Sequence, residues 1–132
     1  INEYIFPDDV ITAPTKMGQI FDRFDERCYV GHTHVTGVFT DEPDFYPPAD
    51  LTDNIYRFNA SEKCIVNPGS VGQPRDRDPR AAYLLWTPGG DGETSFGTLR
   101  WRRIDYEIDR TVAAMEAVQL PQGLRDRLYA GR

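Results

Sequence analysis

Residues 28–34 read CYVGHTH, and this stretch decides how the rest of the sequence is interpreted. A short apolar run ends at Gly31, and the chain's two histidines, His32 and His34, follow one residue apart. Residues i and i+2 of an extended chain project to the same side, and imidazole is the commonest side-chain metal ligand. Gly31 permits a sharp turn and leaves space beside the backbone. The stretch therefore predicts a strand that delivers two histidines to part of a metal site.

Composition limits the classes of protein to be considered. The chain has 132 residues, 39% of them hydrophobic, which suits one folded domain or a part of one. The net charge of −6 argues against nonspecific binding to nucleic acid or to an anionic membrane. No apolar run approaches the ~18 residues of a membrane span. Cys28 and Cys64 lie in separate apolar runs without a disulfide framework, which favours the reducing cytoplasm.

Hydrophobic periodicity predicts the helices and strands. Met17, Ile20, Phe21 and Phe24 recur at helical spacing, so a helix is expected over 12–25, after a connecting segment at 1–11. Two further helices are expected, over 109–118 and around 124–128. The expected strands cover 27–31, 35–40, 55–58, 63–66, 82–86 and 94–108.

Loops and turns complete this prediction. Proline and acidic residues predict a loop over 41–50, and glycines a turn over 88–92. A hairpin is expected to join 55–58 to 63–66. The buried parity changes between Trp101 and Ile104, which predicts a β-bulge near 102–103. The fold class is α/β (α+β) with a mostly antiparallel or mixed sheet, because most connections are too short for crossover helices.

Three interpretations of the histidines compete. They are loop residues without a ligand, or members of a structural zinc site with Cys28 and Cys64, or ligands of a two-metal hydrolase, each on a different ion. The acidic residues 41, 42 and 44 follow in the next loop, but the intervening strand is expected to carry them away from the histidines. The residues alone leave the three interpretations open.

A resemblance to a known family favours the third. Residues 31–34 (GHTH), 67–75 (NPGSVGQPR) and 78–83 (DPRAAY), with the ending at 104–131, resemble the calcineurin-like metallophosphoesterases. The similarity is to a bacterial branch related to diadenosine tetraphosphatases and Ser/Thr protein phosphatases. It implies a four-layer α/β/β/α sandwich with a binuclear metal centre. His32 would ligate one ion and His34 the other, with a water between the ions as nucleophile.

The chain departs from the family pattern in one large respect. The family's other ligand motifs, including the Gly-Asn-His motif with the proposed general acid, are missing from the sequence. The resemblance implies that residues 1–132 are the C-terminal part of a single metallophosphoesterase domain, without its N-terminal metal-binding half. Two divalent ions need at least ~8 coordination positions, which two histidines cannot fill. No catalytic residue is therefore expected in this chain, and the fragment alone should be inactive.

The intact protein is expected to be a cytoplasmic metal-dependent phosphatase or phosphodiesterase. Its cofactors would be two divalent ions, manganese, iron or zinc, and its substrate a small phosphorylated molecule or a phosphoprotein. The alternative is a non-catalytic protein-interaction scaffold of the same fold. The sequence leaves the substrate, the identity of the metal and the oligomeric state open.

Residues 67–75 allow two interpretations. Asn67, Ser70 and Arg75 lie near the substrate phosphate, or the segment is a turn that only shapes the backbone. The second is favoured, because a simple meander would put residue 67 at the sheet end opposite the histidines. The arginines and aspartates that alternate over 75–80 are expected to form a solvated ion-pair face.

Overall fold

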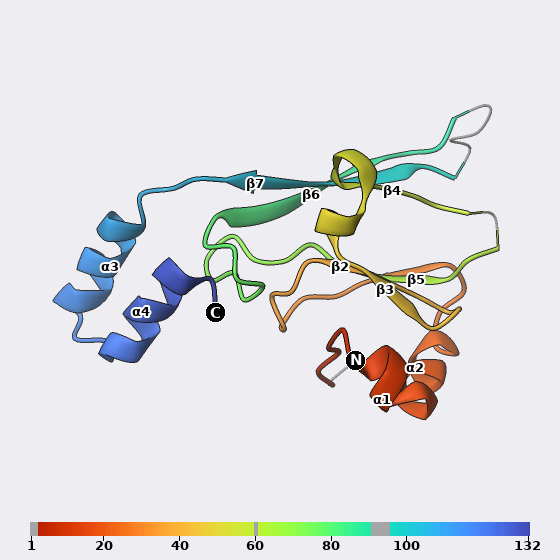
Figure 1. The fold of residues 1–132 in the computed structure, drawn as a ribbon, viewed down its shortest axis with the longest axis horizontal. Coiled ribbons are helices and arrows are strands. Elements are labelled where there is room, and N and C mark those ends of the chain that lie inside the picture. The colour runs from red at the N-terminus through yellow and green to blue at the C-terminus, as the bar shows by residue number, and fades with distance from the viewer. Residues whose placement is uncertain (1–2, 60, 91–95) are drawn as a thin grey trace.

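Two β-sheets stacked on each other form the body of the molecule, with helices at their flanks (Figure 1). The computed structural model describes residues 3–59, 61–90 and 96–132. The first sheet has the order β1-β5-β2-β3 and the second β4-β7-β6. The strands of the first sheet are β1 (Arg27–Tyr29), β5 (Cys64–Asn67), β2 (Gly37–Thr40) and β3 (Asp44–Tyr46). Those of the second are β4 (Ile55–Arg57), β7 (Thr98–Ile104) and β6 (Ala81–Thr87).

The helices occupy two places. Helices α1 (Asp9–Thr12) and α2 (Pro14–Phe21) cover the face of the first sheet that points away from the second (Figure 1). Helices α3 (Ile108–Ala117) and α4 (Gln122–Ala130) pack on each other beyond the end of β7 (Figure 1). Two short 3-10 helices, η1 (Pro48–Asp50) and η2 (Thr52–Asn54), carry the chain from one sheet to the other. The α+β class with two sheets and flanking helices is thus confirmed.

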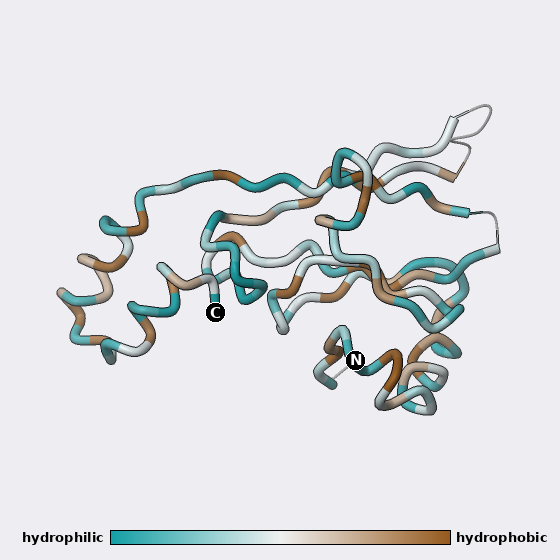
Figure 2. The backbone as a smooth tube through the Cα atoms, viewed as in Figure 1, coloured by the Kyte–Doolittle hydropathy of each residue, from teal (hydrophilic) through white to brown (hydrophobic). Residues whose placement is uncertain are grey.

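The central strands of the first sheet alternate between two cores. Val38 and Val66 face the second sheet, where they meet Leu99 and Trp101. Neighbouring residues of β2 and β5 face α1 and α2 instead, because side chains alternate along a strand. Figure 2 shows the hydrophobic segments on these strands and on the helices beneath them. Both faces of the central strands β2 and β5 are therefore buried, which explains their continuous apolar runs.

The predicted N-terminal helix is confirmed by its buried stripe. Met17, Ile20 and Phe21 are buried against the first sheet, and Phe24 packs beside them. The segment before it was expected to be a plain connection, but it contains α1, and Ile5 belongs to the core. The helices predicted near the C-terminus are also present, as α3 and α4.

The predicted hairpin between 55–58 and 63–66 is wrong. Strand β4 pairs with β7 in the second sheet, whereas β5 pairs with β1 and β2 in the first. The two strands lie in different sheets because their apolar residues fill the shared core from opposite sides. Residue 60 of the connection lies outside the described residues, as do residues 91–92 of the predicted turn and 94–95 of the last predicted strand.

The predicted bulge in the last strand is also wrong. The pairing of β6 with β7 runs without a break from Ala81↔Ile104 to Thr87↔Thr98. Leu99 and Trp101 face the core, while Ile104 is 51% exposed at the strand end and needs no shift of parity. Two smaller differences are that β1 ends at Tyr29, before the predicted end at residue 31, and that the predicted loop 41–50 contains β3.

Among the described residues, every helix is too short or too polar to cross a membrane.

Candidate metal centre

The histidine loop leaves the first sheet at the same edge as the segment that follows β5. Strands β1 and β5 pair in parallel, with Tyr29 opposite Val66, so the segments that follow them leave the sheet in the same direction. Strand β2 starts there too, with Gly37 opposite Asn67. The expectation that residue 67 lies at the sheet end opposite the histidines is therefore wrong. The expectation fails because β1 and β5 pair in parallel, whereas a simple meander contains only antiparallel pairs.

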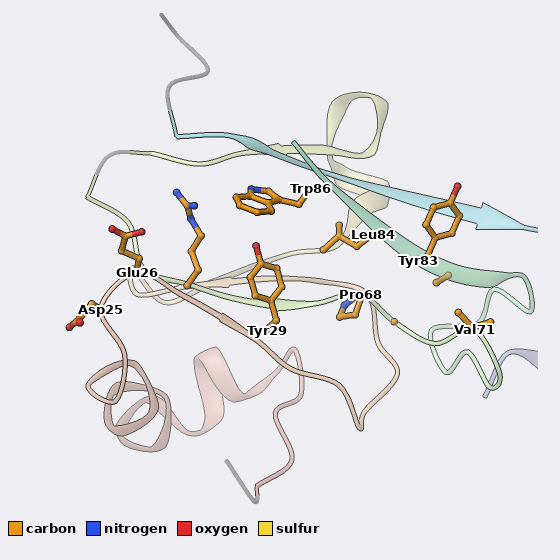
Figure 3. Close-up of a pocket in the computed structure, with 11 residues that line it drawn as sticks. Asp25, Glu26, Tyr29, Pro68, Val71, Tyr83, Leu84 and Trp86 are labelled. Carbon is orange, nitrogen blue, oxygen red and sulfur yellow. The ribbon is translucent and has the colours of Figure 1, made fainter. Parts of the chain in front are cut away.

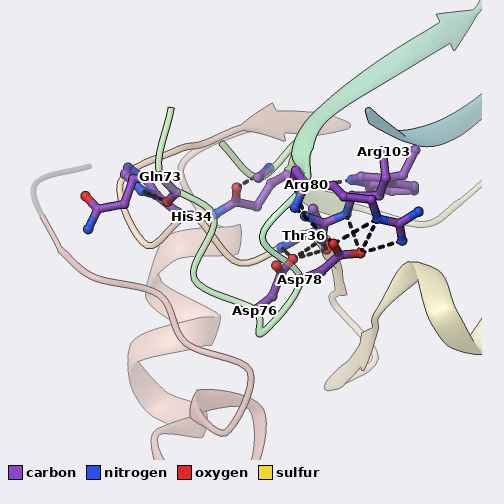
Figure 4. Close-up of polar contacts among 10 residues, drawn as sticks. His34, Thr36, Gln73, Asp76, Asp78, Arg80 and Arg103 are labelled. Atoms are coloured by element: carbon purple, nitrogen blue, oxygen red, sulfur yellow. Dashed lines mark hydrogen bonds and ion pairs between the residues drawn. The ribbon is translucent and has the colours of Figure 1, made fainter. Parts of the chain in front are cut away.

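A backbone carbonyl holds one ring nitrogen of His34, and among the described residues the other ring nitrogen has no hydrogen bond. His34 is half-buried, and its Nδ1 lies 2.7 Å from the carbonyl oxygen of Gln73 (Figure 4). A carbonyl oxygen only accepts hydrogen bonds, so Nδ1 carries a proton, and in the neutral imidazole Nε2 is then the nitrogen with the lone pair. Metal-ligating histidines usually show this arrangement, in which the outer bond fixes the tautomer and the ring orientation. The backbone amide of Arg75 donates to the carbonyl of His34 at 3.3 Å, so hydrogen bonds hold both the ring and the backbone of His34.

His32 is exposed and lies against an aromatic ring from the N-terminal segment. The ring centroids of His32 and Tyr4 are 4.2 Å apart and the planes are inclined by 43°. His32 also lines a hollow of about 560 Å³ together with Glu3, Ile5 and Tyr29. Reasoning from the sequence missed this contact, because nothing in residues 1–11 distinguishes an aromatic residue at the site from one in a connection.

The described residues do not complete a metal site on their own. In ranges 3–59, 61–90 and 96–132, no three histidine, cysteine or acidic side chains form a group able to hold a metal ion. The structural zinc interpretation is therefore wrong. Cys28 packs on the core beneath the first sheet and Cys64 on the core between the sheets, so the two thiols face opposite sides.

The acidic residues of the loop after β2 lie at the far end of that strand. The carboxylate of Asp41 accepts a hydrogen bond from the backbone amide of Lys63, next to the start of β5. Thr40 pairs with Cys64, whereas the histidine loop meets the other end of β5, at Asn67. The expectation that the strand carries these carboxylates away from the histidines is confirmed. His32 and His34 thus suit a metal ion as two nitrogen ligands of a larger set.

A polar network fixes the segment after β5 to the loop before β2. Thr36 donates its hydroxyl to Asp76 Oδ2 at 2.6 Å, and Arg103 binds the same oxygen (Figure 4). The Asp76–Arg103 pair is half-buried, with side-chain exposures of 13% and 17%. Asp78 pairs with Arg80 nearer the surface, and the hydrogen bond from Arg80 lowers the pKa of the Asp78 carboxyl. The predicted solvated ion-pair face therefore describes Asp78 but not Asp76.

A second, larger hollow lies between the terminal strands of the two sheets. It measures about 870 Å³ and is lined mainly by apolar side chains from β1 and β6, among them Tyr29, Leu84 and Trp86 (Figure 3). Trp86 is 54% exposed and Tyr29 is 51% exposed. The lining of this cleft is mainly apolar, whereas the polar side chains that form hydrogen bonds lie around the histidine loop.

Two of the known proteins that the chain matches are similar to it over nearly its whole length. The chain is 30% identical over 130 residues to "Uncharacterized protein MJ0912" of Methanocaldococcus jannaschii, covering 98% of this chain and 46% of that protein. It superimposes on the crystal structure of a metallophosphoesterase from Sphaerobacter thermophilus with a TM-score of 0.77 and 32% identity. That alignment covers 100% of this chain and 50% of the other. No protein-family model matches.

The chain therefore has a fold found in a metallophosphoesterase and spans about half the length of the proteins it matches. This class of fold agrees with the resemblance found in the sequence. The candidate site at the edge of the first sheet consists of two histidines, and the Gln73 carbonyl holds the Nδ1 of one of them, His34.

Proposed function

We propose that the intact protein is a metal-dependent phosphoesterase of the calcineurin-like family, in which His32 and His34 each ligate one of two divalent ions. The observation that carries the proposal is the match of the whole chain to a metallophosphoesterase structure at 32% identity. The fixed tautomer of His34 supports it, because the free Nε2 is the form in which imidazole binds a metal.

The remaining ligands and the general acid are proposed to come from outside these residues. Bound divalent ions would neutralise charge on a phosphoryl group and lower the pKa of a nearby water. The contribution of this chain is to present two nitrogens at a fixed place. Manganese, iron and zinc all accept a mixed nitrogen and oxygen ligand set. The proposed substrate is a small phosphorylated molecule or a phosphoprotein, and the two unpaired thiols agree with a cytoplasmic location.

Hydrolysis of p-nitrophenyl phosphate and its bis ester by the full-length protein tests the proposal. We expect turnover that depends on added manganese and falls at least about 100-fold in His32→Ala and in His34→Ala, because each removes a ligand. Tyr129→Phe serves as a control that should keep the wild-type rate, since it removes only an exposed hydroxyl bond from α4 to Asp109 on α3. The absence of turnover with both esters, together with the absence of bound metal, would instead support the non-catalytic scaffold.

A further inference from the structure

Both histidines have an unusual backbone conformation. His32 has a φ of 74° and His34 a φ of 61°, in the left-handed region that residues with a Cβ rarely adopt. Two such residues separated by one position need a surrounding structure that holds them there. Strain of this kind is found mainly at sites where the conformation is needed for function.

The residue between the two histidines is the anchor of the loop. Thr33 is 3% exposed, whereas His32 is exposed and His34 half-buried. Its hydroxyl accepts a hydrogen bond from Nδ2 of Asn67 at 2.9 Å. Burying Thr33 therefore turns the histidines on either side of it outward, and the bond to Asn67 fixes that arrangement.

Asn67 is itself held in place from three directions. It is 1% exposed, its Oδ1 accepts the backbone amide of Gly69 at 2.9 Å, and its carbonyl accepts Nε1 of Trp101 at 3.1 Å. Its Nδ2 also lies 3.5 Å from the carbonyl of Gly31, at the start of the loop. This amide has one orientation, because the Gly69 N–H can only donate and therefore requires Oδ1, which turns Nδ2 toward Thr33.

We infer that Asn67 and Thr33 are positioning residues that hold His32 and His34 in the left-handed conformation needed to present both rings to the metal centre. The segment after β5 then acts on the site through the backbone of the histidine loop, with Asn67 fixing Thr33 and the Gln73 carbonyl fixing the His34 ring. This inference rests on the proposed metal centre, and it assigns a role to a motif that the sequence left open between a turn and a substrate contact.

The test compares three variants of the full-length protein, two that remove a hydroxyl and one that keeps it. Thr33→Val removes the bond to Asn67 at nearly constant volume, and Thr33→Ser keeps it. Tyr56→Phe is the matched control, because it removes another partly buried hydroxyl bond, to Glu62, from the second sheet. The ¹³Cα chemical shifts of His32 and His34 report the backbone conformation without metal, and calorimetric titration with Mn²⁺ reports the affinity.

We expect Thr33→Val to move both ¹³Cα shifts and to weaken Mn²⁺ binding about 10-fold to 100-fold, as loss of a supporting contact usually does. Thr33→Ser should remain close to wild type, and Tyr56→Phe should lower thermal stability with shifts and affinity unchanged. The inference is overturned if Thr33→Val leaves the shifts unchanged, or moves them without changing the affinity. Wild-type protein that binds no Mn²⁺ refutes the proposed function, and the shifts alone then decide whether Thr33 and Asn67 hold the loop.

Discussion

Replacement of Gly69 by alanine tests directly whether the segment after β5 packs on Thr36, in the loop before β2. Gly69 has a φ of 88°, and a Cβ there would overlap Cγ2 of Thr36 and lie 2.9 Å from Cβ of Ala82. The left-handed conformation costs a residue with a Cβ about 1–2 kcal/mol. Forcing extra volume into a packed site costs about 1–3 kcal/mol more. Gly69→Ala should therefore lower the free energy of unfolding by about 2–5 kcal/mol, a large part of the total for a small domain.

Equilibrium urea unfolding of the full-length protein, followed by tryptophan fluorescence, measures this change. Gly72→Ala is the matched control, because a Cβ at this exposed position in the same loop meets no atom within 4 Å. It should change the unfolding free energy by less than about 1 kcal/mol, mainly through the unfolded chain. Equal stability of the two variants would show that the segment after β5 does not pack on Thr36, and the described arrangement of the loops would be refuted.

Three further predictions concern the core and its charged edge. Trp101→Phe leaves a buried backbone carbonyl without its indole donor and should cost about 1–3 kcal/mol in urea unfolding; no loss would contradict the bond. Burial raises the pKa of the Cys64 thiol to about 12. Iodoacetamide at pH 8 should therefore label Cys28 in the folded protein and Cys64 only after unfolding. Mass spectrometry of the digest measures the labelling of each cysteine. Because Arg80 lowers the pKa of Asp78 in the folded state, the stabilisation is present above about pH 4 and is lost as the pH falls further, so Asp78→Asn should flatten the acid limb of the stability curve. An unchanged acid limb would show that this carboxylate does not contribute.

Periodicity predicted the elements that bury one clear face. Met17, Ile20 and Phe21 identified α2 because a helix against a sheet needs such a stripe. The apolar residues at 35–40 and 63–66 predicted strands there, and the structure shows that β2 and β5 are buried on both faces. These elements follow from local spacing, and local spacing is what a sequence displays.

Pairing between distant strands was not accessible in the same way. Spacing in the sequence predicts that residues 55–58 pair with 63–66. In the structure β4 pairs with β7 instead, and β5 pairs with β1 and β2. The bulge was inferred from Ile104 as if it were buried, whereas the strand simply ends there. The hairpin error comes from treating neighbours in sequence as neighbours in space, whereas the chain crosses from one sheet to the other between β4 and β5.

The same error affected the site. His32 and His34 were predicted as metal ligands, and this remains a prediction. Asn67 was placed at the wrong end of the sheet, since the parallel pairing of β1 with β5 depends on tertiary packing. The motif at 67–75 carried the useful signal, because a buried asparagine next to a turn suits a residue that holds a neighbouring loop.

Anomalous diffraction from crystals of the full-length protein grown with Mn²⁺ tests the central claim most directly. We expect two manganese peaks ~3.5–4 Å apart, one bound by a ring nitrogen of His32 and the other by Nε2 of His34. The bond from His34 Nδ1 to the Gln73 carbonyl should persist in that structure. Crystals of metal-loaded protein in which both histidines are free of manganese would contradict the claim.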